Sequence, residues 1–278
     1  MKIQYLGTAA SEGFPAVFCN CGFCRDARKQ GGKNIRTRSQ AIIDDELLID
    51  FPADTYFHSL QYGVRLDRLK LLLVTHSHGD HFYPRELLLR GSCYAHELAY
   101  EKLPIVCGEG VFREFERVAA PLIEEPVRKG LQFIRAVPFR TLRLCGYEIT
   151  PLPANHMAGE DAMIYIVKKD KCLLYMHDSG FLREETLDFL AENKTYFDFV
   201  SLDCTNVEIP IEDSGSHMGL ENIKRLIKKL EALGAINEKT IKYINHFSHN
   251  ANPMHERLCR LAEPSGLRVA FDGCVAEF

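Results

Sequence analysis

Short apolar runs separated by polar turns dominate the hydrophobic pattern of this chain and predict a structure rich in β-strands. The run over 69–74, Leu-Lys-Leu-Leu-Leu-Val, has the length and the Leu and Val content of a buried strand. Similar runs predict strands over 2–7, 37–43, 46–51, 104–108, 131–137, 142–144, 147–152, 162–167, 171–176, 197–202, 240–244 and 267–271. The pairs around Asp44-Asp45 and Lys169-Asp170 are predicted hairpins.

Apolar residues at helical spacing fall between these runs. Leu and Ile recur every three or four residues from 220 to 233, with Lys and Glu between them, which predicts an amphipathic helix that ends at Gly234. Further helices are expected over 54–62, 84–90, 95–102 and 110–119. Strands and helices thus alternate without a linker or a low-complexity segment, which predicts one α/β domain over residues 1–278.

Two stretches of the chain resemble each other. Residues 44–52 and 170–179 each read as an acidic turn, an apolar strand, an Asp, and then a small or turn residue. The two strand-ending aspartates are Asp50 and Asp178. This weak similarity predicts two related halves in place of two unrelated domains.

The composition narrows the classes of function. Of the 278 residues, 46% are hydrophobic and 26% are charged, and the net charge of −4 comes without a basic block, so a nucleic-acid partner is not expected. No apolar segment approaches the roughly 20 residues of a membrane helix, and the first eight residues are too polar for a signal peptide. Ten cysteines in such a chain indicate a reducing cytoplasm and favour metal ligation over disulfides.

The densest group of metal-ligand side chains directly follows the strand over 69–74. The stretch Thr75-His76-Ser77-His78-Gly79-Asp80-His81 puts three imidazoles and a carboxylate within six residues. In an extended segment, His76 and His78 point to the same side. Asp80 and His81 follow Gly79, which lets the backbone turn. The spacing therefore predicts one pair of ligands for a first metal and a second pair for another.

A second group of candidate ligands is Cys19, Cys21 and Cys24. The spacing from Cys21 to Cys24, with Gly22 between them, is that of a zinc knuckle. Unligated thiols or a redox pair are the alternatives, but three close thiols without a metal would invite oxidation. Only three thiolates are local, so a tetrahedral site requires a fourth ligand from elsewhere in the chain.

Other candidates also stand at the ends of predicted strands, where open α/β sheets place their sites. His156 follows 147–152, Asp178 follows 171–176, and His246 follows 240–244. Asp50 occupies the same kind of position, and its residue type alone favours a simple turn residue there.

The order His-x-His-x-Asp-His, His, Asp, His resembles the metallo-β-lactamase-fold hydrolases over nearly the whole chain. This resemblance implies an αββα sandwich, with two mixed sheets flanked by helices. It implies two divalent metals, and nitrogen and carboxylate ligands suit manganese, zinc or iron. By the same resemblance, His76, His78 and His156 bind the first metal, Asp80, His81 and His246 bind the second, Asp178 bridges both, and Asp50 supports the metal loop.

The amino-terminal segment resembles a narrower group, the PhnP-type phosphodiesterases associated with carbon–phosphorus lyase. The match rests on Gly7-Thr8-Ala9-Ala10 and on the cysteine spacing. It implies that His249 completes a structural zinc site with Cys19, Cys21 and Cys24. It also implies that His217, in the loop before the late amphipathic helix, acts at the reaction centre as a general acid.

These resemblances predict a cytoplasmic metal-dependent hydrolase, a phosphodiesterase for a small or cyclic phosphodiester that acts through a metal-bridging hydroxide. Its catalytic residues would be His217, Asp80 and Asp178. The expected partner is a small-molecule substrate, no membrane is expected, and a homodimer is left open. A thioesterase or lactonase of this fold is one alternative. A PqqB-like accessory or oxidative protein of cofactor biosynthesis is the other, because Ala10 to Pro15 with Cys19-Asn20-Cys21 resembles PqqB too, although the intact His motif favours a hydrolase.

Overall fold

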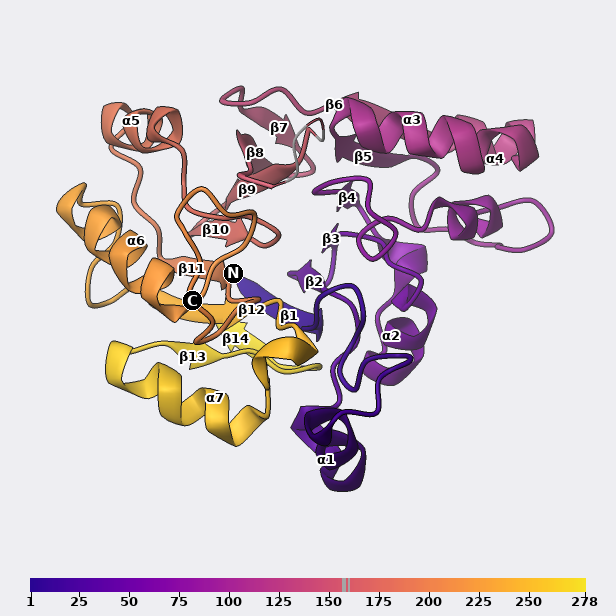
Figure 1. Cartoon of the computed structure of the whole chain (residues 1–278). Coiled ribbons are helices and arrows are strands. Elements are labelled where there is room, and N and C mark those ends of the chain that lie inside the picture. Colours follow the sequence, from indigo (N-terminus) through magenta and orange to yellow (C-terminus); the bar gives the residue numbers. More distant parts are fainter. Residues whose placement is uncertain (157–158, 160) are drawn as a thin grey trace.

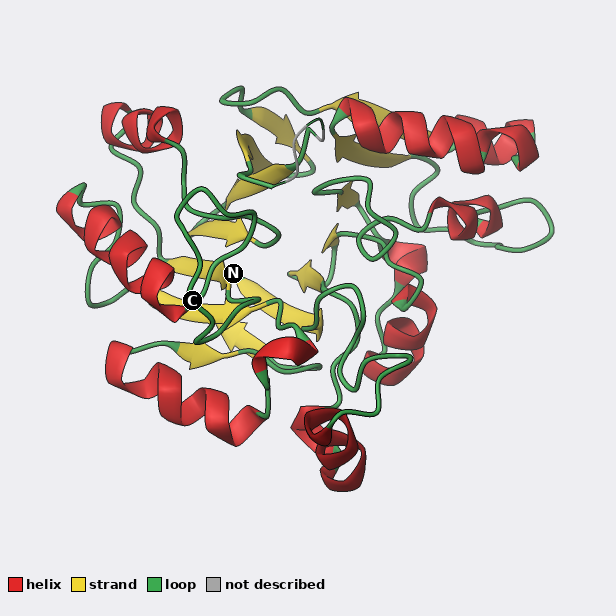
Figure 2. Ribbon diagram, viewed as in Figure 1, coloured by secondary structure: helices red, strands yellow, loops and turns green. Residues whose placement is uncertain are grey.

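Two seven-stranded β-sheets lie face to face with helices on their outer sides in the computed structural model of the chain (Figure 1; Figure 2). The structure describes residues 1–156, 159 and 161–278. The first sheet has the order β14 (Val275–Glu277), β1 (Lys2–Gly7), β2 (Gln40–Ile43), β3 (Leu47–Ile49), β4 (Leu71–Leu73), β5 (Leu103–Cys107) and β6 (Leu131–Arg135). The second has the order β13 (Arg268–Val269), β12 (Ile241–Asn245), β11 (Phe199–Asp203), β10 (Cys172–Met176), β9 (Met163–Lys168), β8 (Tyr147–Pro153) and β7 (Leu142–Leu144).

The two sheets repeat one pairing pattern. In the first sheet, β1, β2 and β3 pair antiparallel, and β3, β4, β5 and β6 pair parallel. In the second, β8, β9 and β10 pair antiparallel, and β10, β11, β12 and β13 pair parallel. The pairs β2–β3 and β9–β10 are the two predicted hairpins, so Asp50 after β3 and Asp178 after β10 occupy equivalent places. The prediction of two related halves is confirmed.

Apolar side chains fill the space between the sheets and the space under the helices. Tyr5, Leu73, Tyr165 and Tyr175 belong to the buried cluster between the sheets. On the outer side of the first sheet lie α2 (Thr55–Tyr62), α3 (Glu109–Val118) and α4 (Glu125–Lys129), and on that of the second lie α5 (Glu184–Glu192), α6 (Leu220–Ala232) and α7 (His255–Ala262). Strands buried on both faces read as continuous apolar runs, which explains the pattern of the sequence.

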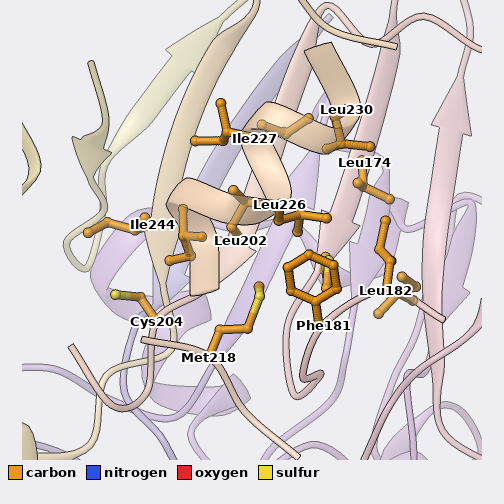
Figure 3. Close-up of a cluster of buried hydrophobic side chains, with 14 of the residues drawn as sticks. Leu174, Phe181, Leu182, Leu202, Cys204, Met218, Leu226, Ile227, Leu230 and Ile244 are labelled. Atoms are coloured by element: carbon orange, nitrogen blue, oxygen red, sulfur yellow. The ribbon is translucent and has the colours of Figure 1, made fainter. Parts of the chain in front are cut away.

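Helix α6 shows how the sequence positions these layers. Leu226, Ile227 and Leu230 point from the helix onto the second sheet, where they pack against Leu202 and Ile244 (Figure 3). The helix ends as its pattern predicts, with Gly234 in the left-handed region at φ 68°. Burying such apolar stripes contributes about 25 cal/mol per Å² of apolar surface removed from water.

The region after the His motif differs from its prediction. Residues 84–90 form a 3-10 helix, η3 (Pro84–Leu89), and the helix predicted over 95–102 is wrong, because that stretch has no regular structure. Glu97 has a φ of 55°, and the carbonyl oxygens of Tyr100 and Glu101 accept hydrogen bonds from the Arg90 guanidinium. Tertiary contacts here override the helix propensity of the residues. Among the described residues, no helix is both long and apolar enough to cross a membrane.

Candidate active site

The candidate ligands lie just after the ends of strands, and these strand ends face one another. The motif from His76 to His81 follows β4, His156 follows β8, Asp178 follows β10, and His246 follows β12. Asp178 has a φ of 48° and His246 a φ of 63°, as does Asp50 after β3 at 67°. Non-glycine residues in the left-handed region are strained, and such residues cluster at functional sites. The sharp turns direct these side chains across the sheet edge.

The first predicted ligand group comes together in the structure. Ligand atoms of His76, His78 and His156 all lie within 4.8 Å of one another. Nε2 of His76 lies 3.0 Å from Nδ1 of His78, and Nε2 of His156 lies 3.3 Å from the same nitrogen. Three ring nitrogens thus converge on one point, as a tetrahedral or octahedral cation requires.

The second predicted group also comes together, and Asp178 stands between the two. Ligand atoms of Asp80, His81, Asp178 and His246 lie within 4.8 Å of one another. Oδ2 of Asp178 contacts Nε2 of His81 and lies 3.0 Å from Nε2 of His246. The same carboxylate reaches the first group, with 3.9 Å to Nε2 of His76 and 3.9 Å to Nδ1 of His156. This position suits a carboxylate shared by two cations.

Unsatisfied buried atoms test whether these residues fit divalent metals. Nε2 of His81, Nε2 of His246 and Oδ2 of Asp178 are buried and have no hydrogen-bond partner, although they face one another. A buried polar atom without a partner is costly, and coordination of a cation would satisfy all three atoms together. Imidazole nitrogens with a carboxylate suit zinc, manganese or iron. The residues therefore fit the metals that the sequence predicts.

Buried partners orient the ligand rings. Oδ2 of Asp50 lies 2.7 Å from Nδ1 of His81, and Asp50 also accepts hydrogen bonds from the backbone N–H and the hydroxyl of Thr75. This contact directs Nε2 of His81 toward Asp178. A carboxylate behind a ligating histidine is the usual arrangement in metal sites. Asp50 thus lies where the resemblance places it, behind the metal loop.

A residue that sequence reasoning missed, Asp203, does the same at the end of β11. Its Oδ2 lies 3.4 Å from Nδ1 of His246 and 3.2 Å from Nδ1 of His217. It also accepts hydrogen bonds from the backbone N–H groups of Thr205 and Met218. Its position was the one signal in the sequence: Asp203 ends a buried strand, and Asp50 and Asp178 each come just after one.

The Asp203 contact brings His217 into the metal site. Nδ1 of His217 lies 3.4 Å from Oδ1 of Asp178, and its ring stacks on that of His246 at a centroid distance of 5.7 Å. Burial alone would lower the pKa of His217, but the carboxylates of Asp203 and Asp178 outweigh burial and raise the pKa. His217 is 26% exposed, so the ring remains open to a substrate.

The carboxylates have a similar effect on the metal-free ligands. Burial opposes the charged form, but Asp178 raises the pKa of His246 to about 10 and that of His81 well above its usual range. The two imidazoles in turn hold the pKa of Asp178 well below its usual range, against the effect of burial. Cation binding at these nitrogens would therefore release protons.

His177, the neighbour of Asp178, lies on the other side of the strand. Its Nε2 lies 2.7 Å from the Ser201 hydroxyl and its Nδ1 3.1 Å from the Ser39 hydroxyl. Its ring packs on Tyr175 at a centroid distance of 3.9 Å. Neighbouring residues of a strand face opposite ways, and His177 is a satisfied core histidine.

The cysteine cluster forms a separate site at the start of α1 (Gly22–Gln30). The three sulfurs of Cys19, Cys21 and Cys24 lie within 4.8 Å of one another. The backbone N–H of Cys24 in the first helical turn lowers the pKa of the Cys21 thiol to about 7, which favours a thiolate. No His249 nitrogen lies within 4.8 Å of all three sulfurs; its Nδ1 is 2.8 Å from Oε1 of Glu12. Its role as the fourth ligand stays a prediction.

A cavity of about 260 Å³ opens over the histidines. His217 and five of the ligand candidates line it, together with Ser11, Glu12, Thr205, Ser216 and Ser248. A larger apolar cavity of about 490 Å³ lies between α2 and η3 and contains none of the ligand candidates. The smaller cavity is the candidate active site, because the chemically active groups face it.

Comparison with a family model gives a match over residues 49–246 to the beta-lactamase superfamily domain. Among solved structures, a diphosphatase described as belonging to the PhnP family superposes with a TM-score of 0.72 at 22% identity, covering 100% of this chain and 97% of that one. PqqB from Methylobacterium extorquens, solved with bound zinc, superposes with a TM-score of 0.68 at 16% identity and covers 100% of both chains. At these identities the likeness shows the fold, and it confirms the predicted αββα sandwich.

One curated relative matches in part. An octanoyltransferase from Porphyromonas gingivalis is 36% identical over 101 residues, which are 36% of this chain. The matched segment spans 20% of the length of that relative.

Proposed function

We propose that this chain, which belongs to the beta-lactamase superfamily, is a metal-dependent phosphodiesterase for small phosphodiesters. The observation that carries the proposal is the pair of ligand groups with Asp178 between them and His217 beside it. Two divalent cations bound there would supply a hydroxide at neutral pH and neutralise the charge of a phosphoryl group. Membership of the superfamily supports a hydrolytic reaction, and the residues of this chain support the metal sites and the proton donor.

The ligands would hold the cations in a fixed geometry. His76, His78 and His156 would form one site, Asp80, His81 and His246 the other, and Asp178 would be shared. Asp50 orients the ring of His81 from behind, and the Thr205 hydroxyl together with Asp203 orients that of His246, so both rings are positioned before a cation binds. Groups that are already in place lose little entropy when the reaction begins.

His217 would act as the general acid. With Nδ1 held by Asp203, its Nε2–H is the proton that a leaving oxygen can receive. The raised pKa favours the protonated form that a general acid requires. A phosphodiester needs such a donor because an alkoxide is a poor leaving group. The position of His217 therefore supports a phosphodiester with an alcohol leaving group.

A second candidate function is hydrolysis of an acyl thioester, and the partial match to the octanoyltransferase favours it. The same metals and the same His217 could act on an acyl carbonyl. The experiment compares two substrates on the purified, manganese-loaded protein: bis-p-nitrophenyl phosphate and the octanoyl thioester of N-acetylcysteamine. We expect turnover of the diester and at most trace turnover of the thioester. The reverse order would replace the phosphodiesterase proposal with the thioesterase.

A further inference from the structure

Glu12 is an acidic side chain in the wall of the candidate active site. It lines the same cavity as His78, Asp178 and His246. Its Oε1 accepts hydrogen bonds from the Ser248 hydroxyl at 2.7 Å and from the backbone N–H of His249 at 3.0 Å, and Nδ1 of His249 lies 2.8 Å away. Three contacts on one oxygen fix the direction of the carboxylate.

The second oxygen of Glu12 remains available. Oε2 accepts a hydrogen bond from the hydroxyl of Ser11 at the long distance of 3.5 Å. An ionised carboxylate oxygen accepts about two hydrogen bonds, and it donates none. Oε2 can therefore accept a hydrogen bond from a group that enters the cavity.

No arginine or lysine among the described residues lines this cavity. Arg38 contacts the backbone of Ser11 but is paired: its Nε donates to the carbonyl oxygen of Ser11, and its Nη1 pairs with Asp54 at 3.2 Å. Phosphate groups in proteins are recognised mainly by arginine, lysine and backbone N–H groups. Apart from the metal ligands and His217, the polar wall consists of Glu12 and hydroxyl side chains.

We infer that Glu12 selects substrates whose part beyond the scissile phosphodiester is uncharged and carries a hydroxyl group, and that it rejects substrates with a second phosphate. This inference rests on the proposed function, because it assumes that one phosphoryl group occupies the metal site. A hydroxyl would donate to Oε2 of Glu12. A second phosphate beside Glu12 would place a charge of the same sign next to that oxygen, and no arginine or lysine among the described residues lines the cavity to pair with it.

The test measures binding, so it does not depend on turnover. Calorimetry on the manganese-loaded protein gives Kd for thymidine 5′-monophosphate and for thymidine 3′,5′-bisphosphate. Either phosphate of the bisphosphate can occupy the metal site, and the other then meets Glu12. We expect the bisphosphate to bind at least tenfold more weakly than the monophosphate. Equal or tighter binding of the bisphosphate would overturn the inference.

Variants assign the effect to Glu12. Glu12→Gln should bring the two Kd values within about threefold, and Glu12→Asp should keep the discrimination, because it keeps the charge. Glu192→Gln removes the same charge from the exposed end of α5 and should behave as wild type. If Glu12→Gln does not fold, Ser11→Lys decides instead: this exposed residue lines the cavity, and the added cation should reverse the preference. An unchanged Kd ratio in Glu12→Gln or in Ser11→Lys would contradict the inference.

Turnover of bis-p-nitrophenyl phosphate separates the proposed phosphodiesterase function from the proposed selectivity of Glu12. If that ester is not hydrolysed but the Kd ratio is as expected, the proposed function fails and the selectivity stands. If the ester is hydrolysed while the bisphosphate binds as well as the monophosphate, the selectivity fails and the proposed function stands.

Discussion

Oδ2 of Asp203 lies 3.2 Å from Nδ1 of His217. This contact holds His217, which belongs to a surface loop, against metal ligands that follow the neighbouring strands. The same carboxylate faces Nδ1 of His246 at 3.4 Å. One buried side chain thus orients both a predicted ligand and the predicted general acid. Because Asp203 ends β11, a central strand of its sheet, the sheet itself sets the position of His217 relative to the metals.

The role of His217 as an acid predicts that its loss depends on the leaving group. His217→Ala should slow an alkyl phosphodiester by 10²–10⁴-fold, the usual effect of removing a general acid. A p-nitrophenolate leaves readily without a proton, so bis-p-nitrophenyl phosphate should be slowed only modestly. The measurement is kcat for both substrates, with metal analysis on the same samples. Equal losses would mean that His217 binds phosphate, and loss of metal would make it a ligand.

The Asp203 contact predicts a shift in the pH profile. In Asp203→Asn the carboxylate that raises the pKa of His217 is gone, so that pKa should fall. His217 acts in its protonated form, so kcat for an alkyl ester should decline at a lower pH than in the wild type. Bis-p-nitrophenyl phosphate should show no such shift. If the alkaline limb stays in place while activity falls, Asp203 is merely structural.

The cysteine cluster predicts a structural zinc that is separate from the active site. Cys21→Ser should remove about one zinc per chain and lower the melting temperature, because a closed thiolate site contributes folding energy. Cys93→Ser is the matched control, since Cys93 is an exposed free cysteine outside the cluster. Metal analysis and thermal unfolding check both variants. Unchanged zinc content in Cys21→Ser would rule out the zinc assignment.

A buried hydrogen-bonded relay of His58, Thr37 and Asp272 lies apart from the metal ligands. It predicts two opposite effects of pH on stability. The Thr37 hydroxyl lies 2.7 Å from Nε2 of His58 and 2.6 Å from Oδ2 of Asp272. Burial lowers the pKa of His58 to about 4 and raises that of Asp272 to about 6. Between these pH values the unfolded chain holds a proton on His58 that the native chain lacks, and the native chain holds one on Asp272 that the unfolded chain lacks. The two contributions cancel in the wild type.

Single variants should therefore expose one contribution each. Relative to the wild type, Asp272→Asn should gain stability as the pH rises from about 4.5 to about 6.5, and His58→Gln should lose it, each by about 1–2 kcal/mol. Urea unfolding of the metal-free protein at both pH values measures the difference. Two variants with the same sign of change would contradict the shared relay.

The ligands could be predicted from the sequence because their signal is local. Four of them stand in one motif after an apolar strand, and His156, Asp178 and His246 follow strands whose ends meet at one edge. Asp203 and Glu12 carry no such signal, because their importance comes from contacts with residues 14 to 237 positions away. Only the folded chain shows those contacts.

The same distinction between local and tertiary signals holds for the helices and strands. Strands and α6 were predictable because continuous apolar runs and a full apolar stripe record their burial. Helix α7 escaped prediction because it buries only Leu258 and Ala262, too few to show a period. Residues 95–102 have good helix formers, but Glu97 has a φ of 55°, which a right-handed helix excludes. Local preference decides an element only where tertiary contacts agree with it.

The central claim is that two divalent cations share Asp178 and that hydrolysis requires both. The most direct measurement is the rate on bis-p-nitrophenyl phosphate as manganese is added back to protein whose active site has been stripped with a chelator, beside the same titration of Asp178→Asn. Asn keeps one neutral oxygen acceptor and cannot hold two cations. We predict that wild-type activity rises until two equivalents are bound and that Asp178→Asn stays inactive with its fold intact. Full activity at one equivalent, or near-normal turnover by Asp178→Asn with two metals bound, would contradict the claim.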